Sequence, residues 1–246
     1  MSALFNHAMR YEWIDKNPIK LVRQSARRER IPEILEPAEL RALLAELGEP
    51  CRTMVFLAAS TGLRISELMA LKWRDIDFDS QEMNLCRSVV SQVVGWMKTE
   101  SSHKPLPLDP GIAAVLLGWR AHTAFNQPDD WLFASPQMLG KQPYWPETLL
   151  RRHIRPAAKR AGIKKKIGWH TLRHTYGTLL KANGEDVKTV QELMRHANSQ
   201  TTLNVYAQAV TPAKRLAQHK IVHILSGKGA GAVPFGSHET TAEGRM

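Results

Sequence analysis

The centre of the predicted fold is the segment CRTMVFLAASTGLRISELMALKW, residues 51–73. Its first part, residues 51–60, is apolar on nearly every side, which is typical of a helix buried in a core. Thr61 and Gly62 then interrupt the helical pattern, because glycine adopts turn conformations that other residues avoid. We expect a second, short helix to follow within RISELMALKW, residues 64–73.

The region before this segment is predicted to contain two helices and a linker. The first helix is expected within residues 4–24, ending near Asn17 and Pro18, because proline disfavours continuation of a helix. Residues 23–37 are charged and bounded by proline, which is typical of a linker. In the second helix, leucines recur at helical spacing before a glycine stop signal: Leu40, Leu43, Leu44 and Leu47.

The region after this segment is predicted to contain a small antiparallel sheet and then more helices. Residues 75–108 consist of short apolar segments separated by polar residues or glycine, which is typical of short strands. Helical spacing returns in several later segments: 112–119, 147–161, 170–184, 186–195, 199–209 and 213–225. The predicted fold class is therefore mainly α with a small antiparallel β-sheet, an α+β fold.

The chain has 246 residues and a formal net charge of +11, and its basic residues are concentrated in one region. Residues 151–220 hold 15 lysines and arginines against 3 aspartates and glutamates, an excess of +12. This concentration favours binding to a polyanion such as nucleic acid, because phosphate contacts supply most of the non-specific affinity. A solvated basic face is the alternative that charge alone leaves open.

The composition excludes several classes of protein. With 43% hydrophobic and 23% charged residues, the chain is neither fully disordered nor collagen-like. It has no apolar run of the roughly 18 residues needed to span a bilayer, and its first residues lack the pattern of a secretory signal. Its two cysteines cannot build a disulfide framework. We expect a cytoplasmic protein with reduced thiols and no membrane partner.

Several motifs of nucleotide binding, metal binding and serine hydrolases are missing from the sequence, which contains no GxxxxGKS/T, GxGxxG, HExxH or GxSxG pattern. We therefore expect no cofactor. The chemical candidates are basic side chains at breaks in regular structure, followed by one tyrosine: Arg64, Lys98, His170, Arg173, His196 and Tyr206. Taken singly, each has an ordinary structural explanation. His170 and His174 have a spacing that could hold a metal, but no carboxylate lies nearby in sequence, so we expect no metal site.

Taken together and in this order, these residues resemble the catalytic domain of the tyrosine recombinase (phage integrase) family. TGLRISELMALKWRDID, residues 61–77, is similar to the first arginine box of that family, and Lys98 to the lysine of its β-hairpin. HTLRHTYGTLL resembles the His-x-x-Arg box, and LMRHANSQTTLNVYAQ resembles the box that ends with the tyrosine. The resemblance covers about residues 33–210. One departure is Arg195, which precedes His196 where the family often has glycine.

The resemblance implies a role for each of the six candidates in cutting a DNA phosphodiester. Arg64 and Arg173 would clamp the non-bridging oxygens with paired N–H groups, and His196 would add a hydrogen bond. Tyr206 would attack the phosphorus, with His170 as proton acceptor and Lys98 as proton donor to the departing 5′ oxygen. The resulting phosphotyrosine conserves the energy of the broken bond, so religation requires neither ATP nor metal. This agrees with the missing nucleotide motifs.

The resemblance also implies a domain organisation. Residues 1–24 would be the last helix of a core-binding (SAM-like) domain whose remainder is absent, and 25–36 a linker. Residues 37–225 would form the catalytic domain, and the glycine-rich residues 226–246 a disordered tail. Family members usually carry the whole core-binding domain and close the two domains around DNA, so the chain is expected to be a truncated member, to have a misassigned start or to be a trimmed piece.

Double-stranded DNA is the expected partner, which implies association with the nucleoid. The residues expected to follow the DNA backbone are Arg151, Arg152, Arg155, Lys159, Lys164, Lys165 and Lys166. In the family, the final helix often docks on a neighbouring protomer, which would assemble a tetramer on two DNA sites; packing within its own domain is the alternative. Accessory DNA-bending proteins are further expected partners.

The leading hypothesis is a site-specific DNA strand-transferase that acts in integration or excision of a mobile element. A DNA-binding module without productive recombination is the alternative from a different class, because most of the clamp is missing. A topoisomerase-like or resolvase role would use the same chemistry with another biological outcome. A plain helix-turn-helix regulator would not need the six-residue constellation.

Overall fold

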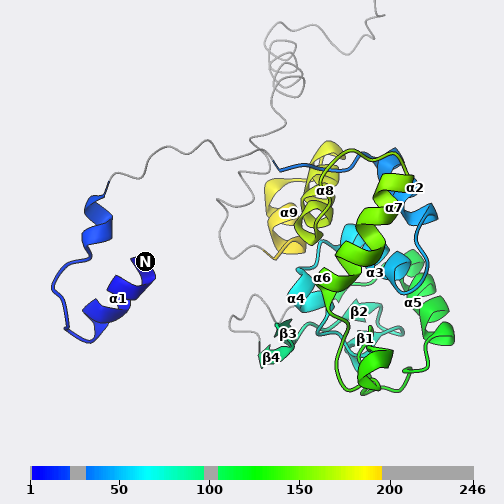
Figure 1. Cartoon of the computed structure of the whole chain (residues 1–246), viewed down its shortest axis with the longest axis horizontal. Coiled ribbons are helices and arrows are strands. Elements are labelled where there is room, and N and C mark those ends of the chain that lie inside the picture. Colours follow the sequence, from blue (N-terminus) through cyan, green and yellow to red (C-terminus); the bar gives the residue numbers. More distant parts are fainter. Residues whose placement is uncertain (1, 23–31, 97–104, 196–246) are drawn as a thin grey trace, which may run out of the picture. The chain divides into compact units, whose positions relative to one another are not determined.

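The computed structural model describes residues 2–22, 32–96 and 105–195 (Figure 1). Contacts divide the chain into two units, Met1–Pro32 and Glu33–Met246. The helices expected at 199–209 and 213–225 and the tail at 226–246 lie outside the described residues. In the part of the chain that is described, none of the helices combines the length and the apolar character needed to cross a membrane.

The first unit corrects the prediction of one helix within residues 4–24. Helix α1 (Ser2–Arg10) ends early, where the Trp13 N–H donates to the Ala8 carbonyl at 3.0 Å and Glu12 has φ 57°. Pro18 begins the 3-10 turn η1 (Pro18–Leu21), because its missing N–H costs nothing at a first helical position. Buried Asn17 joins both elements: its amide donates to Asn6 Oδ1 at 2.7 Å and its Oδ1 accepts from the Ile19 N–H at 3.0 Å.

The second unit is built around helix α3 (Cys51–Thr61), as the apolar sequence predicts. Helices α2 (Pro37–Ala45), α5 (Pro110–His122) and α8 (Trp169–Ala182) pack against α3 (Figure 1). The side chains of Met54, Val55 and Leu57 are completely buried or nearly so. Burying a side chain of this size contributes on the order of 1.5–3 kcal/mol, so α3 anchors the elements that carry the candidate residues.

Helix α3 ends at Gly62, which has the left-handed conformation with φ 64°. A Cβ atom at this position would lie only 2.4 Å from Cδ1 of Tyr176 on α8, so the turn requires glycine for space as well as for conformation. The next helix, α4 (Ile65–Leu68), is shorter than the predicted segment 64–73. It is followed by the 3-10 turn η2 (Trp73–Asp75).

The predicted antiparallel sheet is present as two small sheets. Strands β1 (Ile76–Asp77), β2 (Glu82–Met83) and β5 (Leu106–Pro107) form the first, in the order β1-β2-β5, with Met83 opposite both Ile76 and Leu106. Strands β3 (Arg87–Val90) and β4 (Val93–Trp96) form a separate hairpin in which Arg87 is opposite Trp96. The described residues are thus mainly helical with a small antiparallel component, which confirms the predicted α+β class.

The remaining helices carry the basic region. Helix α6 (Pro146–Leu149), the π-helical turn η5 (Leu150–Ile154) and helix α7 (Arg155–Arg160) form a continuous helical run, close to the predicted 147–161. Helix α9 (Val187–Leu193) follows α8 and contacts it. A 3-10 turn, η4 (Pro136–Met138), lies between α5 and α6.

Candidate active site

Arg64 is placed at the start of α4 by the Gly62 turn and is held by a carboxylate one turn further on. Its Nη1 donates to Oε1 of Glu67 at 3.0 Å, and its backbone N–H donates to Oε2 of the same residue at 3.0 Å. Its Nη2 donates to the carbonyl of Arg195 at 3.2 Å. The side chain remains 39% exposed. The contacts with Glu67 and with the Arg195 carbonyl use one N–H each of Nη1 and Nη2 and leave the other guanidinium donors unused. The others can face a ligand.

Arg173 lies on the buried side of α8, where only 7% of its surface is exposed. Its Nη1 donates to the carbonyl of Gly62, and its Nη2 donates to the carbonyl of Met194. Burial, and to a smaller extent the nearby positive charge of Arg64, lowers the pKa of Arg173 to about 10. The guanidinium therefore stays charged at neutral pH. Its two carbonyl partners link the Gly62 turn to the end of α9.

The structure brings the two predicted arginines into one hydrogen-bonded network, although they are far apart in sequence. Arg64 contacts the carbonyl of Arg195, and Arg173 contacts the carbonyl of the preceding residue, Met194. The two residues that directly follow α9 therefore contact both guanidinium groups. Paired arginines of this kind are suited to a phosphate, because each offers several N–H donors in a planar array.

Glu67 is a site residue that the sequence analysis missed. Its side chain is 4% exposed and forms ion pairs with Arg64 Nη1 at 3.0 Å and with Arg195 Nη1 at 3.6 Å. The sequence carried one signal for it, an acidic residue three positions after Arg64 in a helical segment, which is the spacing of a helical ion pair. These contacts hold the Arg64 side chain beside Glu67 at the start of α4.

His170 lies in the first turn of α8, three residues before Arg173, and is exposed. No hydrogen bond joins it to the two arginines among the described residues. One turn later, His174 is partly buried, and burial, followed by the charges of His170 and Arg173, lowers its pKa. Within residues 2–22, 32–96 and 105–195, no three His, Cys, Asp or Glu side chains gather in a way that could hold a metal.

The other three predicted catalytic residues, Lys98, His196 and Tyr206, lie outside the described residues. The structure therefore places Arg64, Arg173 and His170. The last described residue of the second unit is Arg195, directly before His196 in the sequence.

The basic residues predicted to contact DNA fall into two groups. Arg155 and Lys165 are engaged within the fold: Arg155 Nε donates to the Ile167 carbonyl at 3.1 Å, and Lys165 Nζ donates to Glu39 Oε2 at 2.6 Å. The others are exposed, and no hydrogen bond or ion pair joins their side chains to another described residue: Arg151, Arg152, Lys159, Lys164 and Lys166.

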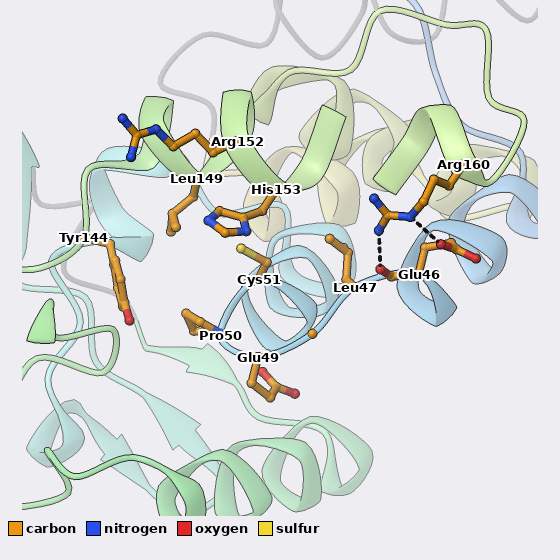
Figure 2. Close-up of a pocket in the computed structure, with 11 residues that line it drawn as sticks. Glu46, Leu47, Glu49, Pro50, Cys51, Tyr144, Leu149, Arg152, His153 and Arg160 are labelled. Atoms are coloured by element: carbon orange, nitrogen blue, oxygen red, sulfur yellow. Dashed lines mark hydrogen bonds and ion pairs between the residues drawn. The ribbon is translucent and has the colours of Figure 1, made fainter. Parts of the chain in front are cut away.

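A cavity beside α6, η5 and α7 shows the contrast between an engaged and an exposed arginine (Figure 2). Arg160 is turned toward Glu46, with Nε 2.8 Å from Glu46 Oε2, whereas Arg152 extends away without such a partner among the residues drawn. Cys51 also lines this cavity, and burial raises the pKa of its thiol to about 11. This thiol is therefore a poor nucleophile, and the cavity shares no lining residue with the arginine network.

Comparisons with known proteins identify the family of the chain. The sequence model of the phage integrase family matches residues 31–211. A tyrosine recombinase of Pseudothermotoga lettingae is 31% identical over 224 residues, which cover 90% of this chain and 72% of the relative. Tyrosine recombinase XerD of Ralstonia nicotianae is 30% identical over 208 residues, which cover 80% of this chain and 63% of the relative. The chain thus spans less than two thirds of the second protein.

Solved structures show the same fold. The integrase of transposon Tn1549, in complex with a circular intermediate DNA, matches with a TM-score of 0.68 and 21% sequence identity. The match covers 89% of this chain and 76% of the integrase chain. At this level of identity the similarity concerns the fold alone.

Proposed function

The chain belongs to the phage integrase family of tyrosine recombinases, and from this premise we propose that it is a site-specific DNA recombinase. It would cut and rejoin double-stranded DNA through a 3′-phosphotyrosine intermediate, in integration or excision of a mobile element. The observation that carries the proposal is the network in which Glu67 and two adjacent carbonyls hold Arg64 and Arg173.

The arginine network supports the first part of the reaction, binding of the scissile phosphate. Arg64 keeps N–H donors that the fold does not use, and Arg173 stays protonated because its pKa is about 10. Two fixed positive charges stabilise the negative charge on the non-bridging oxygens in the transition state. His196 adds a hydrogen bond to the same oxygens.

The remaining residues carry out the transfer. Tyr206 Oη attacks the phosphorus in line, the bond to the 5′ oxygen breaks, and a tyrosyl phosphate ester forms. The tyrosine proton passes to His170, and Lys98 gives a proton to the 5′ oxygen as it departs. The 5′ hydroxyl of a second strand then attacks the ester and releases Tyr206. One phosphoester bond is exchanged for another at each step, so no external energy source is required.

The exposed basic residues of η5 and α7 and the lysines that follow support a DNA partner. They place positive charge along one helical run and along the segment that follows it, and their side chains form no ion pairs with other described residues. We assign them contacts to the DNA backbone, which would position the enzyme rather than read the sequence. We extend the same proposal to assembly: the protein would form a tetramer on paired DNA sites. Accessory DNA-bending proteins would take part, and the complex would be associated with the nucleoid.

Trapping of a covalent protein–DNA adduct tests the proposed function. DNA that flanks the gene, nicked near the expected cleavage positions so that religation is prevented, is incubated with the wild type and resolved on a denaturing gel. A slowly migrating band is expected for the wild type and for Tyr144→Phe, a control at a partly buried tyrosine. It should be absent for Tyr206→Phe. If the wild type shifts the same DNA on a native gel but gives no adduct, the alternative of a binding module replaces the enzyme.

A further inference from the structure

Arg195 combines an unusual backbone conformation with a buried charged side chain. Its φ is 52°, in the left-handed region that residues with a Cβ atom rarely adopt. Its side chain is only 6% exposed, and its Nη1 lies 3.6 Å from Oε2 of Glu67. Burying a guanidinium is costly unless an opposite charge compensates it. The carboxylate of Glu67 provides that compensation.

Residue 195 contacts the arginine network in two separate ways. Its carbonyl accepts a hydrogen bond from Arg64 Nη2 at 3.2 Å, and any amino acid with this backbone conformation would provide that carbonyl. Its guanidinium pairs with Glu67, and only an arginine or a lysine could supply that charge. Glycine, which adopts positive φ without strain, would keep the first contact and lose the second.

The two oxygens of Glu67 are shared between two arginines. Oε1 accepts from Arg64 Nη1, while Oε2 accepts from the Arg64 backbone N–H and faces Arg195 Nη1. A carboxylate held from both sides has one orientation, and it transmits that orientation to the guanidinium of Arg64. Arg195 also balances a negative charge that would otherwise lie beside the bound phosphate. With it, the cluster of Arg64, Arg173, Arg195 and Glu67 has three positive charges and one negative charge.

We propose that Arg195 is a positioning residue for strand cleavage: it fixes the carboxylate of Glu67 and thereby holds Arg64 in the orientation that the scissile phosphate requires. The inference rests on the proposed function, because it concerns the same site. It assigns a role to the side chain of Arg195, although a glycine would adopt the backbone conformation of this position without strain.

The test compares Arg195→Gly with Arg195→Lys in the full chain. The trapped adduct is followed over time at saturating nicked DNA, and the Kd for the same DNA is measured on native gels. We expect Arg195→Gly to lower the cleavage rate at saturation at least tenfold while the Kd changes less than threefold. Arg195→Lys should recover part of the rate. Arg74→Gln, at an exposed arginine, should behave like the wild type.

Glu67→Gln supplies the second arm of the experiment. If Arg195 acts through Glu67, the double variant Glu67→Gln with Arg195→Gly should cleave no more slowly than the slower single variant. Wild-type cleavage by Arg195→Gly would overturn the proposal. The proposal would also be overturned if the reduction in cleavage rate of the double variant equalled the product of the two single reductions. A loss of cleavage that arises only from weaker DNA binding would overturn it as well.

Urea unfolding of the wild type, Arg195→Gly, Glu67→Gln and the double variant separates this proposal from the proposed function. The shifts in the unfolding midpoint should be non-additive, because each substitution removes the same ion pair. If the wild type forms no adduct, the recombinase function fails, and so does the role of Arg195 in cleavage. Non-additive shifts in the unfolding midpoint would then show that the ion pair serves the fold alone. Additive shifts would show that Arg195 and Glu67 do not form this ion pair.

Discussion

Gly62 serves the fold and the candidate site at the same position. It ends α3 with a φ of 64°, lies against the ring of Tyr176, and its carbonyl accepts a hydrogen bond from Arg173. The left-handed turn directs the chain into α4 and sets Arg64 at its start. Gly62 thus contacts Arg173 directly, and its turn determines where Arg64 lies at the start of α4.

Gly62→Ala is expected to destabilise the protein by more than the cost of a left-handed alanine. That conformational cost alone is about 1 kcal/mol. The added Cβ would also overlap Cδ1 of Tyr176, at 2.4 Å, and force the ring or the turn to shift. Such overpacking typically costs a further ~1–3 kcal/mol. The free energy of unfolding, measured in urea, should fall by about 2–4 kcal/mol, and adduct formation should slow because Arg173 loses its partner geometry.

Gly162→Ala is the matched control for this prediction. Gly162 has a φ of 74°, but nothing lies within 4 Å of the position that its Cβ would occupy. It should therefore show the conformational cost without the overlap. Equal losses of unfolding free energy in the two variants would mean that Tyr176 moves aside freely and does not constrain the turn.

At the scale of elements, long periodic segments were predictable and short ones were not. Residues 51–60 predicted α3 because a helix at the centre of a core is apolar all round, and the structure confirms its burial. The helix predicted within residues 4–24 is present but ends at Arg10 rather than near Asn17 and Pro18, and Asn17 instead joins α1 to a separate 3-10 turn through its contacts with Asn6 and Ile19. Such contacts join residues that periodicity does not relate.

Site residues that belong to a recognisable sequence motif were predictable. A site residue whose contacts form only when distant segments of the chain meet was not. Arg64 and Arg173 followed from their sequence context, and the structure places them in one network. Glu67 was missed because an acidic residue in a short helix is usually exposed. It is buried beside Arg195, which follows α9 and lies 128 residues later in the chain, so the contact comes from the fold and not from the local sequence.

The hairpin β3–β4 is attached to the preceding turn by a buried ion pair. Arg87 on β3 donates through Nη2 to Asp75 of η2, and both side chains are less than 10% exposed. Asp75 also accepts from the Lys72 N–H at 2.7 Å. The predicted catalytic Lys98 follows this hairpin in the sequence and lies outside the described residues.

Arg87→Met is expected to lower the unfolding free energy by about 3–5 kcal/mol, because it leaves the buried carboxylate of Asp75 without its charged partner. Arg74→Met is the matched control, since its ion pair with Asp129 is exposed at both ends and removal of such a pair costs about 0–1 kcal/mol. Urea unfolding measures both. Similar small losses in the two variants would show that Asp75 is readily solvated when Arg87 is removed.

At the scale of the whole chain, some basic residues form ion pairs within the fold and others are exposed to solvent. Arg160 and Lys165 form ion pairs with Glu46 and Glu39, which connect the basic region to α2 and the residue that follows it. The exposed members of the same region are left for a polyanion. The net charge of +11 therefore overstates what is available to DNA, and the position of each basic residue matters more than the total.

This division predicts different salt dependences for two arginines on the same helical run. Each phosphate contact contributes about 0.9 to the slope of log K against log salt, because binding releases condensed counterions. Arg152→Gln should reduce the slope by about that amount, whereas Arg160→Gln should leave it nearly unchanged, since Arg160 is already bound to Glu46. Kd measured for one duplex between low and moderate salt gives both slopes. Equal reductions would mean that Arg160 leaves Glu46 for a phosphate when DNA binds, and that the pairing in the free protein does not decide which residues contact DNA.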